Sequence, residues 1–119
     1  MTRSVLPSAP RFVVRALELA TAKADWEPLR NGIQILRLCG DARLGPSVAL
    51  LRYQPGARVP AHRHPGFEMI YVLEGTQCDE QGTYPAGTLV VNREGVAHSV
   101  WSEEGCLVLI AWEEPVEFL

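Results

Sequence analysis

Proline or glycine interrupts the apolar stretches of this 119-residue chain at short intervals. Short strand-like stretches broken about every eight to twelve residues by turn residues are typical of β-sandwiches and barrels. We expect strands at residues 12–17, 33–38, 47–53, 58–64, 68–73, 89–92, 96–102 and 106–112. The alanine-rich residues 16–24 could instead form a short helix. The length suits one domain, so we predict a single all-β domain over residues 11–119 after a flexible arm of residues 1–10.

The segment of residues 56–75, GARVPAHRHPGFEMIYVLEG, concentrates groups that can bind a metal. His62 and His64 are two residues apart, and side chains at that spacing point to the same face of a strand. The sequence Pro65-Gly66-Phe67 predicts a turn. A hairpin with this three-residue loop would place Glu68 beside His64 on the neighbouring strand.

His98 is the third histidine of the chain, and it lies in the next segment with strand-like alternation. Imidazole nitrogens with one carboxylate suit a divalent transition metal such as iron, nickel, zinc or manganese. An isolated histidine on an apolar strand is commonly a hydrogen-bonded core residue, and Glu68 alone could be a solvated carboxylate. The complete spacing favours a metal site, so we predict His62, His64, Glu68 and His98 as its ligands.

Strand alternation predicts what surrounds these ligands. If Glu68 faces inward, Ile70 and Val72 pack inside the barrel with it. Val96 and Val100 share the face of the third imidazole.

The spacing of the central segment resembles the first motif of the cupin superfamily, Gly-x5-His-x-His-x3-Glu-x6-Gly. Gly56, His62, His64, Glu68 and Gly75 match every fixed position of that motif. The resemblance implies a double-stranded β-helix, also called a jelly-roll barrel.

The second cupin motif, Gly-x5-Pro-x-Gly-x2-His-x3-Asn, is matched in part. Gly87, Gly95 and His98 match it, whereas Arg93 stands in place of the proline and Ser102 in place of the asparagine. Neither change touches an expected metal ligand. Both change the turn before the His98 strand and the hydrogen bonds expected there.

A longer run of residues is similar to the ChrR-like subgroup of cupins. It comprises Trp26, Asp41, Leu51-Arg52, the first motif, Leu73-Glu74-Gly75, Asp79-Glu80, Tyr84, Gly87, Asn92 and Gly105-Cys106. ChrR also has an N-terminal zinc-binding helical domain that holds a sigma factor. We expect this chain to resemble the cupin half only, because it lacks room and cysteine–histidine motifs for that domain, and we do not transfer the anti-sigma activity.

The resemblance implies two functions of different classes. One is a dioxygenase that cleaves carbon–carbon bonds of diketones or hydroxylated aromatic ketones, in which the three histidines bind ferrous iron and Glu68 is a fourth ligand or a nearby base. The other is a binding module without catalysis, in which the metal site senses a small molecule held in the barrel. A metal-free isomerase with His62 as base is a third interpretation, although it does not need the complete ligand set.

Four further residues have open roles. Tyr71, Arg52 and Arg93 are candidate substrate contacts, each with a surface or packing role as the alternative. Cys106 begins an apolar stretch that could line the cavity.

Composition excludes some partners and favours others. The net charge is −3 without a basic cluster, which disfavours nucleic-acid binding. Three dispersed cysteines argue against a disulfide framework and for a reducing compartment.

No stretch has the roughly 20 apolar residues of a membrane helix, and none suits a signal peptide, so we expect a cytoplasmic protein. An unpaired strand edge would favour a homodimer.

Overall fold

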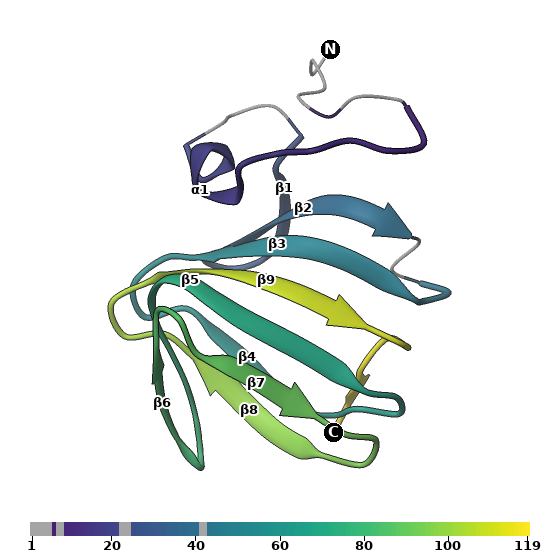
Figure 1. Cartoon of the computed structure of the whole chain (residues 1–119). Helices are drawn as coiled ribbons and strands as arrows, with labels where there is room; N and C mark the ends of the chain where they lie inside the picture. The colour runs from purple at the N-terminus through teal and green to yellow at the C-terminus, as the bar shows by residue number, and fades with distance from the viewer. Residues whose placement is uncertain (1–5, 7–8, 22–24, 41–42) are drawn as a thin grey trace.

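Antiparallel strands make up most of the molecule, and they curl into a half-barrel (Figure 1). The computed structural model describes residue 6 and residues 9–21, 25–40 and 43–119, so most of the expected flexible arm lies outside the described residues. The elements are α1 (Ala16–Leu19), β1 (Glu27–Arg30), β2 (Ile33–Gly40), β3 (Ser47–Tyr53), β4 (Arg58–Arg63), β5 (Glu68–Asp79), β6 (Gly82–Pro85), β7 (Leu89–Asn92), β8 (Ala97–Trp101), β9 (Cys106–Trp112) and β10 (Glu117–Phe118). The all-β jelly-roll prediction is confirmed.

The strands form two layers that share one long strand. The first layer has the order β1-β2-β3-β9-β5-β7, and the second joins β6 and β8 to β5 and continues through β4 to β10. Strand β5 belongs to both layers because residues 68–75 pair with β9 and its last four residues pair with β6. Gly75, with φ of +73°, lies where β5 passes from one layer to the other, next to a register shift against β9.

Two predicted features of the central segment are wrong. Strands β4 and β5 do not pair as a hairpin, because β4 pairs with β8 and β10. The turn after His64 instead carries the chain from one layer to the other, and this still brings Glu68 next to His64. We also expected this strand to end at residue 73, but β5 continues through Gly75 to Asp79.

The remaining differences occur in short or peripheral elements. Residues 12–15 are not a strand, and the helical alternative is correct for α1, although residues 22–24 lie outside the described residues. Strands β1, β6 and β10 have only two to four residues, too few for an alternation to be recognised. Strands β3, β7 and β9 have the predicted bounds.

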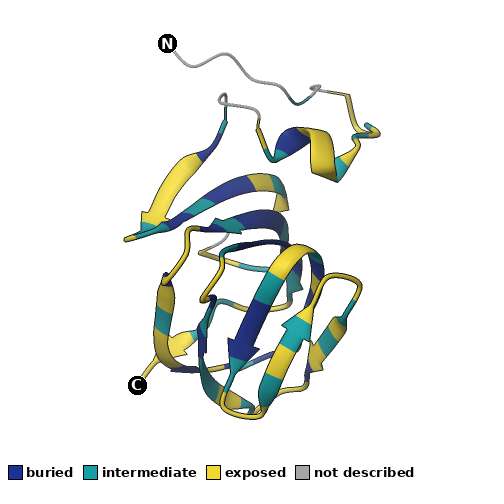
Figure 2. Cartoon of the chain, turned by 90° about the vertical axis from the view of Figure 1, so that its left-hand side faces the viewer, coloured by how far each residue is buried: buried dark blue, intermediate teal, exposed yellow. Residues whose placement is uncertain are grey.

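Two apolar clusters lie on opposite faces of the first layer. The inner cluster fills the half-barrel, and the outer cluster lies beneath α1 and the N-terminal segment (Figures 1 and 2). Strand β9 contributes to both, with Val108 in the inner cluster and Leu107 in the outer one. This explains why its sequence is continuously apolar. None of the helices in the described part of the chain is long and apolar enough to cross a bilayer.

Candidate metal centre

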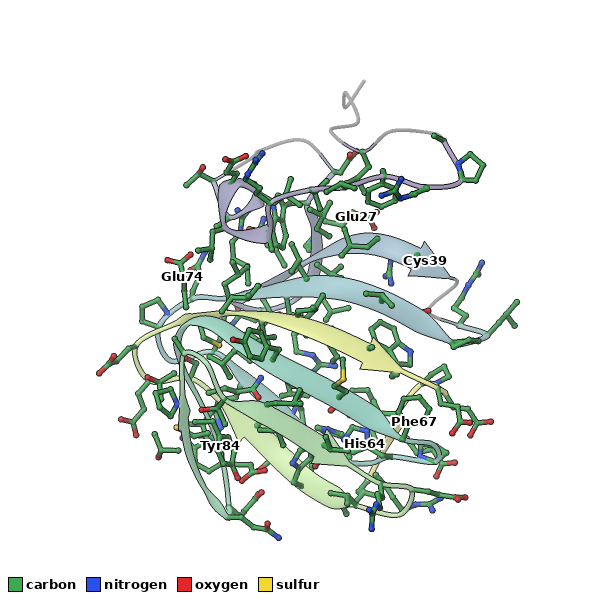
Figure 3. The ribbon with its side chains drawn as sticks, viewed as in Figure 1. Glu27, Cys39, His64, Phe67, Glu74 and Tyr84 are labelled. Carbon is green, nitrogen blue, oxygen red and sulfur yellow. The ribbon has the colours of Figure 1, made fainter. Side chains whose placement is uncertain are left out.

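Three histidine side chains converge inside the half-barrel from two paired strands. His62 on β4 is the register partner of His98 on β8. His64 follows directly after β4, where its backbone N–H donates to the carbonyl of Val96 at 2.9 Å. The ring centroids are 4.8–5.1 Å apart, and the potential ligand nitrogens all lie within 4.8 Å of one another. Figure 3 shows the labelled His64 among the strands of the second layer. The fold and this triad therefore provide a site that could bind a metal.

Hydrogen bonds orient two of the three rings. His62 Nδ1 lies 2.8 Å from the carbonyl oxygen of Pro60, and His98 Nδ1 lies 3.0 Å from Oδ2 of Asp79. Both partners are acceptors, so Nδ1 carries the proton and donates in each case. The Nε2 lone pair of each ring is then free to bind a metal.

The spacing of one nitrogen pair fits a single ion. The Nε2 atoms of His64 and His98 are 3.0 Å apart. Two nitrogens at about 2.0–2.1 Å from one ion, in adjacent coordination positions, are themselves separated by about 3 Å. A donor set of neutral imidazoles suits iron, nickel, zinc or manganese, and the geometry does not distinguish between these metals.

Glu68 lies at the edge of the triad. Its Oε1 is 3.5 Å from Nε2 of His64, and the side-chain amide of Asn92 donates to the same oxygen at 3.2 Å. Burial raises the pKa of Glu68 to about 7, and the hydrogen bond from Asn92 opposes this rise. Ile70 and Val72 are buried on the same face of β5, as the alternation predicted.

Burial favours the neutral form of two of the imidazoles, His64 and His62. It lowers the pKa of His64 to about 4, and the neighbouring His62 and His98 act in the same direction. Burial also lowers the pKa of His62, with smaller contributions in that direction from His98 and Arg30. Neutral histidine is the form that binds metal, so His64 does not need to lose a proton when a metal binds near neutral pH.

The raised pKa of Glu68 predicts how the stability of the metal-free protein depends on pH. A buried acid with a raised pKa stabilises the folded state while protonated, and this contribution is lost as pH rises from about 4.5 to 7. In the wild type, the free energy of unfolding should therefore fall by roughly 3 kcal/mol over this range. Glu68→Gln should abolish this fall, because glutamine does not titrate. Denaturant titrations of chelator-treated wild type and variant would measure it. Parallel stability curves for the two proteins would contradict the expectation.

Asp79 and Tyr84 form a supporting chain behind His98 that we did not predict from the sequence. Tyr84 donates its hydroxyl to Oδ1 of Asp79 at 2.6 Å, while Oδ2 accepts from His98. Burial raises the pKa of Asp79, but the hydrogen bonds from Tyr84 and His98 outweigh it and the net pKa is lowered. Burial and Asp79 together raise the pKa of Tyr84 to about 12. Both residues belong to the run that resembles ChrR-like cupins, which is the signal that could have identified them.

Asp79→Asn is expected to weaken metal binding about 10–100-fold without removing a ligand. An amide can present its NH₂ group to His98 Nδ1, which favours the tautomer with the proton on Nε2. Competition with a chromogenic chelator would measure the affinity. Glu103→Gln is the matched control, since it also neutralises an acid, in an exposed bend that does not line the cavity. Equal affinities of the Asp79 variant and wild type would show that Asp79 does not orient His98.

A cavity of about 220 Å³ opens beside the triad. His62 and Glu68 lie on its wall together with Tyr53, and two arginines, Arg30 and Arg37, also line it. Most of the remaining lining is apolar: Leu29, Ile35, Leu51, Val59, Ile70, Val100, Ile110, Trp112, Pro115, Val116 and Phe118. An apolar cavity with a few convergent polar groups is typical of a small-molecule site.

The four residues with open roles lie away from this cavity wall. Arg52 stacks on Trp26 at 4.1 Å on the outer face and donates to Gln34, which is a packing role. Tyr71 is on the exposed face of β5, and Arg93 is exposed in a turn. Cys106 is buried in the inner cluster but does not line the cavity. The three cysteines are free, as expected.

The half-barrel and its histidine triad define a cupin with a potential metal site. The chain belongs to the ChrR cupin-like domain family, whose model matches residues 15–115. It is 33% identical to the anti-sigma-E factor ChrR of Cereibacter sphaeroides over 94% of this chain and 53% of that protein. The chain thus spans about half the length of this curated relative.

Solved structures support the fold. ChrR of Rhodobacter sphaeroides, in its complex with SigE, has a TM-score of 0.68 at 26% identity, over 78% of this chain and 50% of that one. An acetylacetone dioxygenase from Acinetobacter johnsonii has a TM-score of 0.76 at 15% identity, over 98% of this chain and 83% of that one. A putative acetylacetone dioxygenase from Methylibium petroleiphilum has a TM-score of 0.75 at 17% identity, over 96% of this chain and 85% of that one. At these identities the two dioxygenase structures show a common fold.

Proposed function

We propose that this cupin is a metal-dependent dioxygenase that cleaves a small diketone or hydroxylated aromatic ketone. The observation that supports it most is the position of His62, one residue of the triad, and of Glu68 on the wall of an apolar cavity. Such a cavity would exclude bulk water from a ligand that chelates a metal through two oxygens. The fold shared with an acetylacetone dioxygenase is compatible with this chemistry, and the proposal itself rests on the site.

In this proposal His62, His64 and His98 hold the metal through nitrogen, with iron, nickel, zinc and manganese as the candidates. A bound metal would supply Lewis acidity toward an enolate oxygen and redox chemistry toward dioxygen. Glu68 touches His64 and also lines the cavity, so it serves either as a fourth ligand or as the base that takes the proton of the enolisable carbon. In the overall reaction one carbon–carbon bond breaks, and both atoms of dioxygen end in the two oxidised fragments.

Dioxygen uptake tests this proposal. Chelator-treated protein would be reloaded with ferrous iron, nickel, zinc or manganese in turn and mixed with acetylacetone and larger diketones under an oxygen electrode. We expect uptake with one redox-active metal and none with zinc, together with equimolar loss of the diketone. Loaded protein that binds diketones but takes up no oxygen with any metal would contradict the oxygenase function.

A binding module that senses a small molecule is the second candidate. The observation in its favour is the 33% identity to a protein described as an anti-sigma factor. In this case the cavity binds its ligand without turnover, and the bound ligand stabilises the folded state by mass action. Ligand-induced increases in melting temperature without oxygen uptake would support this candidate over the dioxygenase.

A further inference from the structure

Arg30 brings a positive charge to the wall of the ligand cavity. It ends β1 and is half-buried, and its guanidinium carbon lies 4.8 Å from the ring centroid of Phe118. The Phe118 ring lies 6.0 Å from the ring of His62, so the charge is close to the triad. A guanidinium stacked on an aromatic ring keeps the N–H groups along its edge available as donors.

Arg37 on β2 lines the same cavity, although its side chain is exposed. Within the described part of the chain, neither arginine has a carboxylate partner, whereas Arg63 on β4 pairs with Glu117. Glu68 is the single acid among the described lining residues, and its carboxylate contacts His64 and Asn92. The two cavity arginines therefore have donors that no acid in the described part of the chain uses.

The charge balance of the cavity favours an anion. Arg30 is half-buried beside apolar walls, where solvent screens a charge pair less than at an open surface, and the exposed Arg37 adds a second permanent cation. A metal held by neutral imidazoles would add further positive charge. A carboxylate is the group that a guanidinium binds best, through two parallel N–H···O bonds.

From this arrangement we propose that the ligand is a dicarbonyl compound that carries a carboxylate, with the dicarbonyl directed toward the triad and the carboxylate bound by Arg30, assisted by Arg37. The inference rests on the proposed function for the dicarbonyl, and it adds the anionic group as the specificity determinant. An apolar ligand without a charge would leave both guanidiniums unpaired beside it, which costs affinity relative to the anion.

Two probes that differ by one charge test this inference. Metal-loaded full chain would be titrated calorimetrically with 2,4-dioxopentanoate and with its methyl ester, which keeps the dicarbonyl and removes the charge. We expect the acid to bind at least about 10-fold more tightly than the ester. Arg30→Met should reduce this preference to less than about 3-fold, and Arg30→Lys should restore part of it.

Two further variants keep the experiment interpretable. Arg58→Met is the matched control, because Arg58 stacks on Trp101 at 5.1 Å and does not line the cavity. It should keep the full preference. Arg37→Met tests the second guanidinium without disturbing the contact with Phe118, and it should lower the preference by a smaller factor. Melting curves would show that each variant is folded.

The outcomes separate this inference from the proposed dioxygenase. Equal binding of acid and ester, or a preference that survives in the Arg30→Met, Arg37→Met double variant, would overturn the anionic ligand. Oxygen uptake with the ester as fast as with the acid would overturn it while leaving the dioxygenase standing. Tight, arginine-dependent binding of the acid without oxygen uptake would support the anionic ligand and contradict the dioxygenase.

Discussion

Gly75→Ala is expected to lower the free energy of unfolding by about 4 kcal/mol or more. A Cβ atom at this position would lie 2.1 Å from the carbonyl oxygen of Gly105 and 2.9 Å from the Cα of Cys106. Both neighbours are backbone atoms, one at the start of β9 and one just before it, so they cannot move away as a side chain could. The positive φ of +73° adds a cost for any residue with a side chain. Gly75→Val should be at least as harmful.

Gly87→Ala is the matched control for this prediction. Gly87 has a similar φ of +91°, but a Cβ atom there would meet nothing within 4 Å. We expect it to cost only about 1–2 kcal/mol, the conformational part alone. Chemical denaturation of the three proteins would measure the difference. If Gly75→Ala cost no more than Gly87→Ala, the close approach of β5 and β9 at Gly75 would be wrong.

Replacing His62 or His98 by alanine is expected to reduce metal affinity more than about 100-fold, beyond the loss expected for a supporting residue such as Asp79. Each variant removes one of three converging nitrogens and leaves the backbone pairing between β4 and β8 intact. Metal content after equilibrium dialysis, measured by mass spectrometry, would report the loss. Circular dichroism should show a retained β-fold.

Tyr71→Ala serves as a control for the histidine variants, because Tyr71 lies on the exposed face of β5. It should bind metal as wild type does. Unchanged metal stoichiometry in both histidine variants would mean that the metal is bound elsewhere or only adventitiously.

The part of the fold that could be predicted from the sequence is the part with a strong local pattern. Strand β3 is delimited by Pro46 and by Gln54-Pro55-Gly56, and its predicted bounds are correct. The predicted strand of residues 68–73 is shorter than β5, because a glycine such as Gly75 is commonly interpreted as a turn residue. In the structure, this glycine allows the strand to change layer. Whether a glycine with positive φ ends a strand or bends it depends on which strand lies against it, and sequence spacing does not encode that.

The candidate site, too, could be predicted only where the sequence pattern is local. The two-residue spacing of His62 and His64 and the inward parity of Glu68 follow from strand geometry, and the structure places these side chains as expected. The predicted hairpin between β4 and β5 is wrong, because β4 pairs with β8, whose residues lie 34 (Arg63 with Ala97) to 43 (Arg58 with Trp101) positions further along the chain. Asp79 reaches His98 through another long-range pairing, that of β5 with β8, so no local pattern could have linked them.

Several expectations from the sequence stay predictions. They include His62, His64, Glu68 and His98 as metal ligands, the flexible arm of residues 1–10, the homodimer and the cytoplasmic location. Arg30 and Arg37 were not predicted from the sequence as ligand contacts. Their position on the cavity wall depends on how β1 and β2 close over the half-barrel.

The central claim is that His62, His64 and His98 bind one metal ion together. X-ray absorption spectroscopy of the stoichiometrically loaded protein tests it most directly, because it counts imidazole ligands and measures their distances. The account predicts one ion per chain with three imidazole nitrogens at about 2.0–2.2 Å, and an oxygen ligand that is lost in Glu68→Gln if Glu68 is the fourth ligand. A spectrum with one imidazole or none, or with sulfur ligands, would contradict it.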